Sequence, residues 1–332
     1  MELAGISIGI WIAFLGFVGV MLALDLGVFH KDAHEVKMKE ALGWSAVWIA
    51  LALVFNAGIY FFWDKIGAAS NYSNAEAAQA FLAGYLIEKA LSVDNIFVFL
   101  MVFAFFQVPR ALQHRVLFYG ILGALAFRAV FIAAGSALLQ SYHWVVFIFG
   151  GFLVLTGIKM LVMKDKKLDP ERNPVVRAFR KLMPVTPDYV GQKFFTKIDG
   201  KRWATPLFVT LLFIELTDII FAVDSIPAIF AVTRDPFIVF TSNVFAILGL
   251  RALFFALEGL MHMFHFLSYG LAGILMFVGG KMIYSWWDKF PVGLSLVIIV
   301  GILAASVVAS LIWRPKPQPE SEMSGKDAIS AA

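Results

Sequence analysis

Nine apolar runs, each near the roughly 20 residues that cross a bilayer as a helix, divide the chain. They lie at about residues 8–29, 43–63, 78–106, 114–138, 143–163, 205–232, 236–258, 267–287 and 291–313. Hydrocarbon offers no partner to free backbone N–H and C=O groups, so such runs are restricted to helices. Only 15% of the residues are charged, against about 25% in soluble domains. The sequence therefore predicts an all-α, polytopic membrane protein with about nine transmembrane helices.

Lysine and arginine are distributed unequally between the two ends of these runs. The connections after odd-numbered runs, with the C-terminal tail, carry 19 of them, and the other connections carry three. Positively charged connections stay in the cytoplasm, so we predict the N-terminus outside and the C-terminus in the cytoplasm. Glu2 stands where a signal peptide would be basic, so the first run is expected to remain as a helix. The pI of about 9.1 follows from the topology bias, and we expect the lipid bilayer and no nucleic acid as partner.

The connection 164–204 is the only sizeable segment predicted outside the membrane. Residues 174–183 place apolar and basic side chains on different faces, which is typical of a short helix on an anionic leaflet. The pair Asp199-Gly200 is a hairpin turn signal. A basic linker and a regulatory cap are the two interpretations of this connection. The tail 314–332 is polar and rich in proline, which indicates disorder, and 1–332 is predicted to be one transmembrane domain.

Two stretches repeat one pattern of polar residues. EKALSVDNIF (88–97) and DIIFAVDSIP (218–227) align when Asp94 is matched with Asp224. The other polar matches keep their order along the chain: Glu88 with Asp218, Asn95 with Ser225, Arg128 with Arg251, and Lys159 with Lys281. The units 78–163 and 205–287 each hold three apolar runs, and three is odd. The second unit must then enter the membrane from the opposite face, so we predict two inverted three-helix repeats with a shared site, as in secondary transporters.

Acidic residues inside apolar runs are costly, because one charge at the bilayer centre opposes insertion by about 2.5–3.5 kcal/mol. The acids in question are Asp25, Glu88, Asp94, Glu215, Asp218 and Asp224. Arg128 and Arg251 are predicted to pair with carboxylates, and Lys89 is a further counter-ion candidate. Lys159 and Lys281 lie near the ends of their runs, where lysine snorkels to the interface. Purely structural ion pairs are the alternative, but two deep arginines cannot neutralise four or five deep acids.

Each unit places polar residues along one helical face, because residues three, four or seven apart project together. These stripes are Glu88, Ser92 and Asn95 in the first unit, and Glu215, Asp218 and Ser225 in the second. Asp94 and Asp224 lie around the helix from the stripes. Pro227 lacks an N–H and interrupts helices. We therefore expect a local helix break near Asp94 and Asp224 that frees carbonyl oxygens and re-aims both carboxylates.

Carboxylate, carboxamide, hydroxyl and carbonyl oxygens are hard ligands, which suit Mn, Ca or Mg and do not suit Cu or Zn. The chain has no cysteine, and its six histidines fall at or near the ends of the runs. We expect no resident cofactor, and a transported divalent cation bound by Glu88, Asp94, Asn95, Glu215, Asp218, Asp224 and Asp25. Asp25 lies toward the cytoplasmic end of the first run, where it attracts cations or pairs locally. Protonatable carboxylates also permit exchange of the cation for protons.

Several long stretches resemble the TerC family of integral membrane proteins, and its Alx-type bacterial members in particular. They include FLAGYLIEKALSVDNIFVFL (81–100) and ELTDIIFAVDSIPAIFAV (215–232), and no acidic position departs from the family pattern. The resemblance implies a manganese(II) exporter of the bacterial inner membrane. It also implies that the acids of the third and sixth runs matter for transport, namely Glu88, Asp94, Glu215, Asp218 and Asp224.

Three other functions compete with manganese export. Calcium is associated with relatives, so a Ca(II) or other divalent cation/proton antiporter is one alternative. A membrane scaffold in metal stress, without transport of its own, is another. An intramembrane aspartyl protease would carry G-x-G-D at its second aspartate, whereas the chain reads AVDS around Asp224, and the zinc motif H-E-x-x-H is absent. We therefore expect no enzymatic activity, and the sequence specifies no oligomeric state.

Overall fold

The computed structural model describes residues 2–3, 6–27, 38–66, 72–162, 183–258, 266–288 and 290–313. The side chains of residues 2–3, 24–27, 94, 97 and 224 lie outside this description. Residues 174–182 of the helix expected at 174–183, and the whole tail 314–332, also fall outside it.

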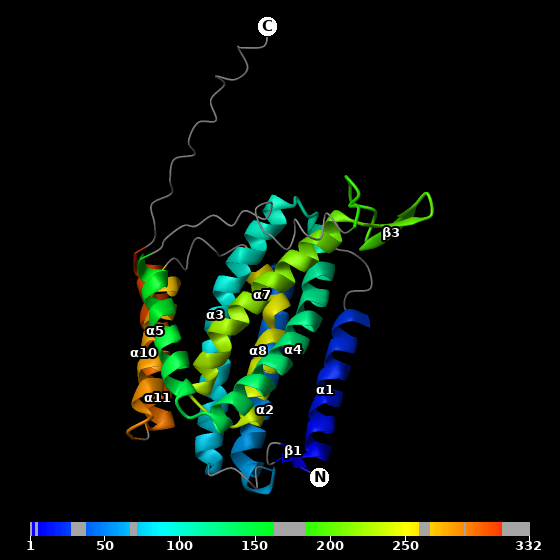
Figure 1. The fold of residues 1–332 in the computed structure, drawn as a ribbon. Helices are drawn as coiled ribbons and strands as arrows, with labels where there is room; N and C mark the ends of the chain where they lie inside the picture. The colour runs from blue at the N-terminus through cyan, green and yellow to red at the C-terminus, as the bar shows by residue number, and fades with distance from the viewer. Residues whose placement is uncertain are drawn as a thin grey trace.

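The described chain is a bundle of long helices (Figure 1). The helices are α1 (Ile8–Gly27), α2 (Met38–Ile66), α3 (Asn74–Phe105), α4 (Arg110–Ser141), α5 (Val145–Val162), α7 (Pro206–Phe230), α8 (Pro236–Leu248), α9 (Leu250–Glu258), α10 (Leu267–Tyr284) and α11 (Val292–Ile312). The strands are β1 (Glu2–Leu3), β2 (Ile6–Ser7), β3 (Phe195–Ile198) and β4 (Lys201–Ala204). Each predicted apolar run coincides with a helix, except that the seventh is divided between α8 and α9.

Six of the described helices are long and apolar enough to cross a membrane, or seven when the bent pair α8–α9 counts as one span. The six are α2, α4, α5, α7, α10 and α11. α3 is as long as α4 but carries Glu88, Lys89 and Asp94 in its middle, and the described apolar part of α1 is shorter. The chain is thus a helical, multi-pass membrane protein, and the count of nine spans stays a prediction.

The outer helices present apolar side chains to their surroundings. Val54 and Phe61 of α2, Leu155 of α5 and Val297 of α11 are each about two-thirds exposed. Apolar bands of this kind are unfavourable in water, whereas lipid tails solvate them. The exposed surface therefore agrees with a protein that is surrounded by a bilayer.

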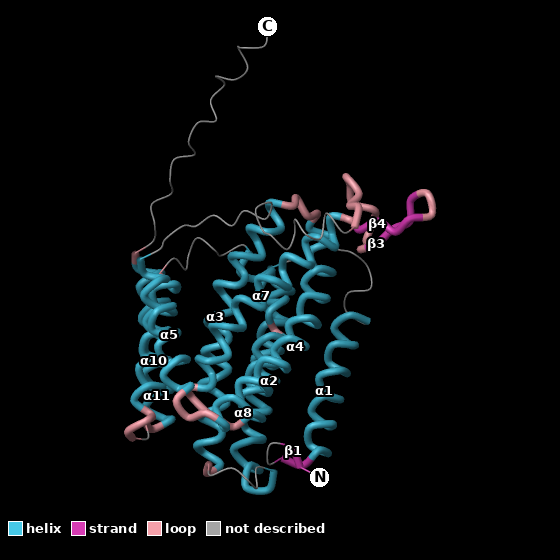
Figure 2. The backbone as a smooth tube through the Cα atoms, viewed as in Figure 1, coloured by secondary structure: helices cyan, strands magenta, loops and turns pink. Residues whose placement is uncertain are grey.

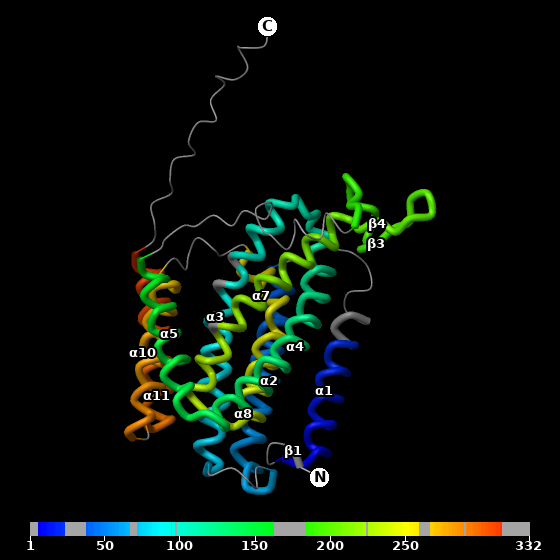
Figure 3. Tube along the Cα trace, viewed as in Figure 1, coloured from blue at the N-terminus to red at the C-terminus, as the bar shows by residue number. Residues whose placement is uncertain are grey.

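The repeated sequences form two sets of helices, which we name unit one (α3, α4 and α5) and unit two (α7, α8–α9 and α10). α3 and α4 each contact both α7 and α8, and α5 packs along α10. Chain direction, followed by colour in Figure 3, runs upward in α3 and downward in α7. The stripes of polar residues in the two units therefore lie on neighbouring, oppositely directed helices.

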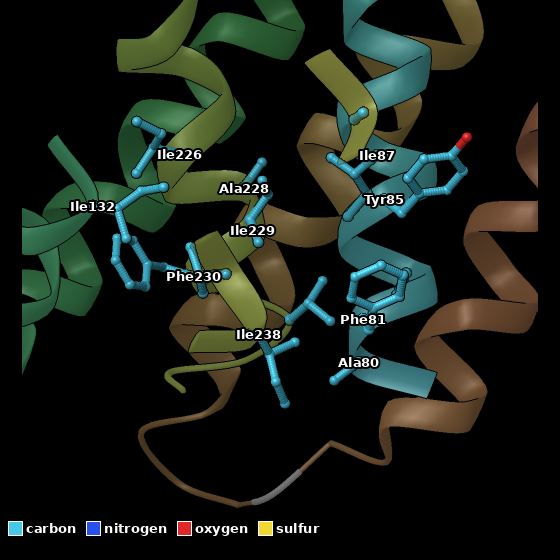
Figure 4. Packing of buried hydrophobic residues seen from close by; sticks show 14 of the residues in the cluster. Ala80, Phe81, Tyr85, Ile87, Ile132, Ile226, Ala228, Ile229, Phe230 and Ile238 are labelled. Carbon is cyan, nitrogen blue, oxygen red and sulfur yellow. The ribbon is translucent and has the colours of Figure 1, made fainter. Parts of the chain in front are cut away.

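The apolar contact between the units is tight. Ile132 of α4 lies beside Ile226 and Phe230 of α7 (Figure 4), and all three are buried in one cluster. The Phe230 ring lies so close to Gly135 of α4 that a Cβ there would come within 2.8 Å of it. Glycine is needed at this point because the two helices approach so closely.

The expected helix break near Asp94 and Asp224 is wrong. α3 and α7 are helical through both positions, and Pro227 is accommodated in the last turns of α7. The break lies instead at Gly249, where α8 and α9 meet at 41°. Pro227 removes one hydrogen bond to the carbonyl four residues earlier, and α7 continues for three residues beyond it.

The turn predicted at Asp199-Gly200 is confirmed. Strands β3 and β4 pair antiparallel across it, and both turn residues have positive φ, 50° and 76°. This hairpin projects from the upper end of the bundle (Figure 2). Tyr189, which precedes it, donates a hydrogen bond from its Oη to the Phe106 carbonyl at the end of α3 (2.7 Å), so the connection is attached to unit one.

Candidate functional site

Arg128 is at the centre of a polar cluster in the interior of the bundle. Its side chain is 2% exposed. The guanidinium donates to Glu88 Oε1 of α3 and to both carboxylate oxygens of Asp218 of α7, at 3.2 and 3.4 Å. A further bond reaches Ser225 Oγ at 3.4 Å. Arginine suits this position because its planar fork carries five donors.

Glu88 is bound from a second side by unit two. Asn243 Nδ2 of α8 donates to Glu88 Oε2 at 3.1 Å, so both oxygens of this fully buried carboxylate are engaged. Asn243 Oδ1 is buried and has no hydrogen-bond partner among the described residues. Sequence reasoning missed Asn243; the available signal was a carboxamide that follows Thr241 and Ser242 inside the apolar run 236–258.

The cluster joins both units at one place. Glu88 and Arg128 come from unit one, and Asp218, Ser225 and Asn243 come from unit two. Two carboxylates share one guanidinium, so the described cluster carries one net negative charge. Removing one charged member would leave another without its partner, which is very unfavourable in a low dielectric.

Glu215 lies outside this cluster, one turn before Asp218 on α7. Its carboxylate presses against Gly123 of α4, where an added Cβ would overlap it. Glu215 Oε2 is buried, with no hydrogen-bond partner among the residues that the structure describes. The stripe predicted on α7 is therefore divided into a paired Asp218 and a carboxylate with one unengaged oxygen.

Lys89, a counter-ion candidate in the sequence, makes a contact that the sequence did not predict. Its Nζ donates to the Ala246 carbonyl at 2.9 Å, at the C-terminal end of α8, and a Cβ on Gly249 would come within 2.7 Å of the ammonium. A cation is favoured at the C-terminal end of a helix, where the last carbonyls lack intrahelical partners. Lys89 of unit one therefore binds the helix break of unit two.

Arg251 follows this break and lines a small cavity together with Asp218. The cavity holds about 10 Å³, close to the space of one water, and its walls come from α3, α4, α7 and α9. Arg251 is 5% exposed. Asp218 thus has Arg128 on one side and the cavity with Arg251 on the other.

The two matched lysines differ in burial. Lys159 of α5 is exposed, as expected for a lysine that snorkels to the interface. Lys281 of α10 is only 7% exposed, and its Nζ lies 5.8 Å from the centre of the Phe290 ring. The prediction of a snorkelling Lys281 is wrong, because the neighbouring helices and Phe290 cover it.

The remaining predicted ligands are placed as follows. Asn95 lies buried on α3, as does Ser92, in agreement with the predicted stripe. Asp25, Asp94 and Asp224 belong to α1, α3 and α7 respectively, but their side chains lie outside the described residues. Among the described side chains, no three histidine, aspartate or glutamate residues come together as a metal-binding group. The role of all seven residues as metal ligands stays a prediction.

Comparison with known proteins gives the family. The family model described as "Integral membrane protein TerC family" matches residues 73–318. The chain is 54% identical to "Uncharacterized membrane protein STKORF319" of Myxococcus xanthus over 306 residues, 92% of this chain and 93% of that protein. It is 46% identical to "Putative membrane-bound redox modulator Alx" of Escherichia coli K12 over 300 residues, 90% of this chain and 93% of that protein.

More distant relatives show the same coverage. An "Uncharacterized membrane protein" of Rickettsia felis is 40% identical over 302 residues, 91% of this chain and 97% of that protein. No solved structure matches the chain. The family model covers more than half of the chain, and it includes every helix of the polar cluster. The chain belongs to the TerC family of integral membrane proteins.

Proposed function

We propose that this protein is a secondary transporter that exports Mn(II) through an acidic site between two inverted three-helix repeats. One observation carries the proposal. Glu88 and Asp218 lie at matched positions of the two units, and both bind the buried side chain of Arg128. A chain that needed only stability would not gain from this arrangement, because apolar residues of similar volume serve as well or better.

The contacts between α5 and α10 support the inverted repeat. Matching Lys159 with Lys281 also matches Gly150 with Ala272 and Gly157 with Gly279. A Cβ on Gly279 would come within 2.6 Å of the Gly150 carbonyl, and one on Gly157 within 2.7 Å of the Ala272 carbonyl. The second contact is the first with the two units exchanged, as a twofold axis between oppositely directed units requires.

The choice of cargo rests on ligand chemistry and on the family resemblance. Carboxylates with Asn and Ser oxygens favour hard dications. The described cluster contains one cation for two carboxylates, and Glu215 adds a third. Asp94 and Asp224 bring further negative charge on the same two helices. Exchange against protons is part of the proposal, since carboxylates released by the cation can take up protons.

The printed name of the Alx relatives refers to redox modulation. The sequence of this chain holds no cysteine, so this chain would not act in redox modulation through thiol–disulfide chemistry. Metal export alters the cell's metal content without any redox-active side chain. We assign the protein to the bacterial inner membrane on the family resemblance, with its N-terminus outside on the distribution of lysine and arginine.

Metal flux into and out of proteoliposomes tests the proposal. Purified protein is reconstituted with a trapped metal-sensitive dye, and Mn(II), Ca(II), Mg(II) and Zn(II) are compared with and without a pH gradient. We expect Mn(II) flux in the wild type, and its loss in Asp94→Asn and in Asp224→Asn. The control Asp199→Asn, at the exposed hairpin turn, should transport normally. Full flux in both membrane variants would refute the site, and no flux in the wild type would favour a scaffold.

A further inference from the structure

Arg128 occupies the carboxylates that the proposed function assigns to the cation. Three of the four carboxylate oxygens of Glu88 and Asp218 accept from its guanidinium, and the fourth accepts from Asn243. A dication that binds Glu88 and Asp218 therefore competes with the guanidinium, since its own ligands are these same oxygens.

We infer that Arg128 is a tethered counter-cation, which occupies the transport site when cargo is absent and leaves it when a dication binds. The inference rests on the proposed function and adds to it how the empty transporter returns. Two carboxylates balance one dication, so bound cargo makes the positive charge of Arg128 superfluous at this point. The displaced guanidinium then requires another carboxylate nearby.

Glu215 is that carboxylate. It lies three residues before Asp218 on α7, about 4.5 Å along the helix axis. Its side chain reaches α4 at Gly123, on the same helix as Arg128 and toward the N-terminus, the direction in which helical side chains lean. Its Oε2 is buried and has no hydrogen-bond partner within the described ranges. Displacement of Arg128 would give this oxygen a partner.

The consequence is a difference between two kinds of transport. In the empty wild-type protein Arg128 binds both carboxylates and compensates one of their two charges, so the empty protein can reorient and net efflux proceeds. Without Arg128 the empty protein holds two uncompensated carboxylates, which resist rearrangement in a low dielectric. Exchange of one Mn(II) ion for another needs only the loaded protein, in which the cargo itself supplies the charge.

Arg128→Gln in proteoliposomes tests this with radioactive Mn(II), measured as net efflux into metal-free buffer and as exchange against external Mn(II). We expect net efflux to fall by about tenfold or more, exchange to stay within about threefold, and the Kd for Mn(II) to tighten by about tenfold, since the competing cation is gone. Glu215→Gln should weaken Mn(II) binding, because the displaced arginine loses its acceptor. Lys159→Gln, which replaces an exposed basic residue of α5, is the matched control. It should leave net efflux, exchange and the Kd for Mn(II) unchanged.

Equal loss of exchange and efflux in a folded Arg128→Gln protein, or weaker Mn(II) binding, would overturn the inference. A variant that folds only when Mn(II) is supplied supports it. If Arg128→Gln fails to fold both with and without Mn(II), Arg128→Lys tests the inference instead. One ammonium competes less well than a guanidinium for two carboxylates. Tighter Mn(II) binding by Arg128→Lys supports the inference, and unchanged or weaker binding contradicts it. A wild type without flux defeats the transport proposal itself, whereas Mn(II) binding still reports on Arg128.

Discussion

Unit one and unit two carry the same order of polar residues, but their second helices differ in shape. α4 continues without a break through Arg128, whereas its counterpart in unit two bends by 41° at Gly249, just before Arg251. The beginnings of these helices differ as well. α4 follows Pro109 with no side-chain cap, and α8 is capped by Asp235, which accepts from the N–H groups of Phe237 and Ile238.

The difference teaches that a repeated sequence pattern does not impose one helix geometry. A lysine of unit one contacts the bend in unit two, because Lys89 donates to the Ala246 carbonyl at the break. The two units thus differ in shape, and a contact between them lies where the shapes differ. Our transport proposal requires such asymmetry, since exchange of the two shapes would open the site to the opposite face.

The largest expected effect comes from removing the charge that the two units share. Arg128→Met leaves Glu88 and Asp218 buried without a cation, and we expect about 3–5 kcal/mol of lost stability in metal-free buffer. The triple variant Glu88→Gln, Arg128→Met, Asp218→Asn should lose much less, because no charge remains uncompensated. Denaturant unfolding in detergent measures both proteins. Similar losses in the single and triple variants would show that the ion pairs do not couple the units.

The sequence was sufficient for the helical runs, the hairpin turn and the meeting of Glu88 with Asp218. It was sufficient because long apolar runs form helices in lipid, and because acidic residues inside a membrane pair with a positive charge, here an arginine. The break at Gly249 was not predicted, and its contact with Lys89 joins residues far apart in the sequence, which spacing along one helix does not reveal. The burial of Lys281 likewise depends on which helices cover α10, and spacing along one helix carries no such information.

An intermediate loss of stability should follow when the hydrogen bond of Lys89 at the helix break is removed. Lys89→Met removes a charged donor from the Ala246 carbonyl, and we expect a loss of about 1.5–3 kcal/mol. Lys159→Met changes an exposed lysine of the same unit and should stay within about 0.5 kcal/mol. Thermal unfolding in detergent compares the two variants. Equal, small effects would mean that the bend of unit two does not need unit one.

The smallest effect on stability concerns Asp235, the N-cap residue of α8, which lies outside the membrane spans. Burial raises the pKa of Asp235 above its ordinary 3.8, and the N–H groups of Ile238 and Phe237 oppose this only in part. A raised pKa means that folding disfavours the charged carboxylate. The stability from Asp235 is therefore complete below its unfolded pKa and is lost as pH rises through the folded pKa.

Asp235→Asn keeps a good capping side chain without the charge. We expect stability within about 1 kcal/mol of the wild type, with the variant gaining relative to the wild type as pH rises from 4 to 7. Melting temperatures across this pH range provide the measurement. A relative gain that shrinks with rising pH would show that the charged cap stabilises α8.

The central claim is that acids of both units form one cation site, and the stoichiometry of Mn(II) binding tests it most directly. Equilibrium dialysis of the purified protein should give one tightly bound Mn(II) per chain. Asp94→Asn in unit one and Asp224→Asn in unit two should each remove that same ion. Two ions in the wild type, of which each variant removes one and keeps the other, would contradict the account.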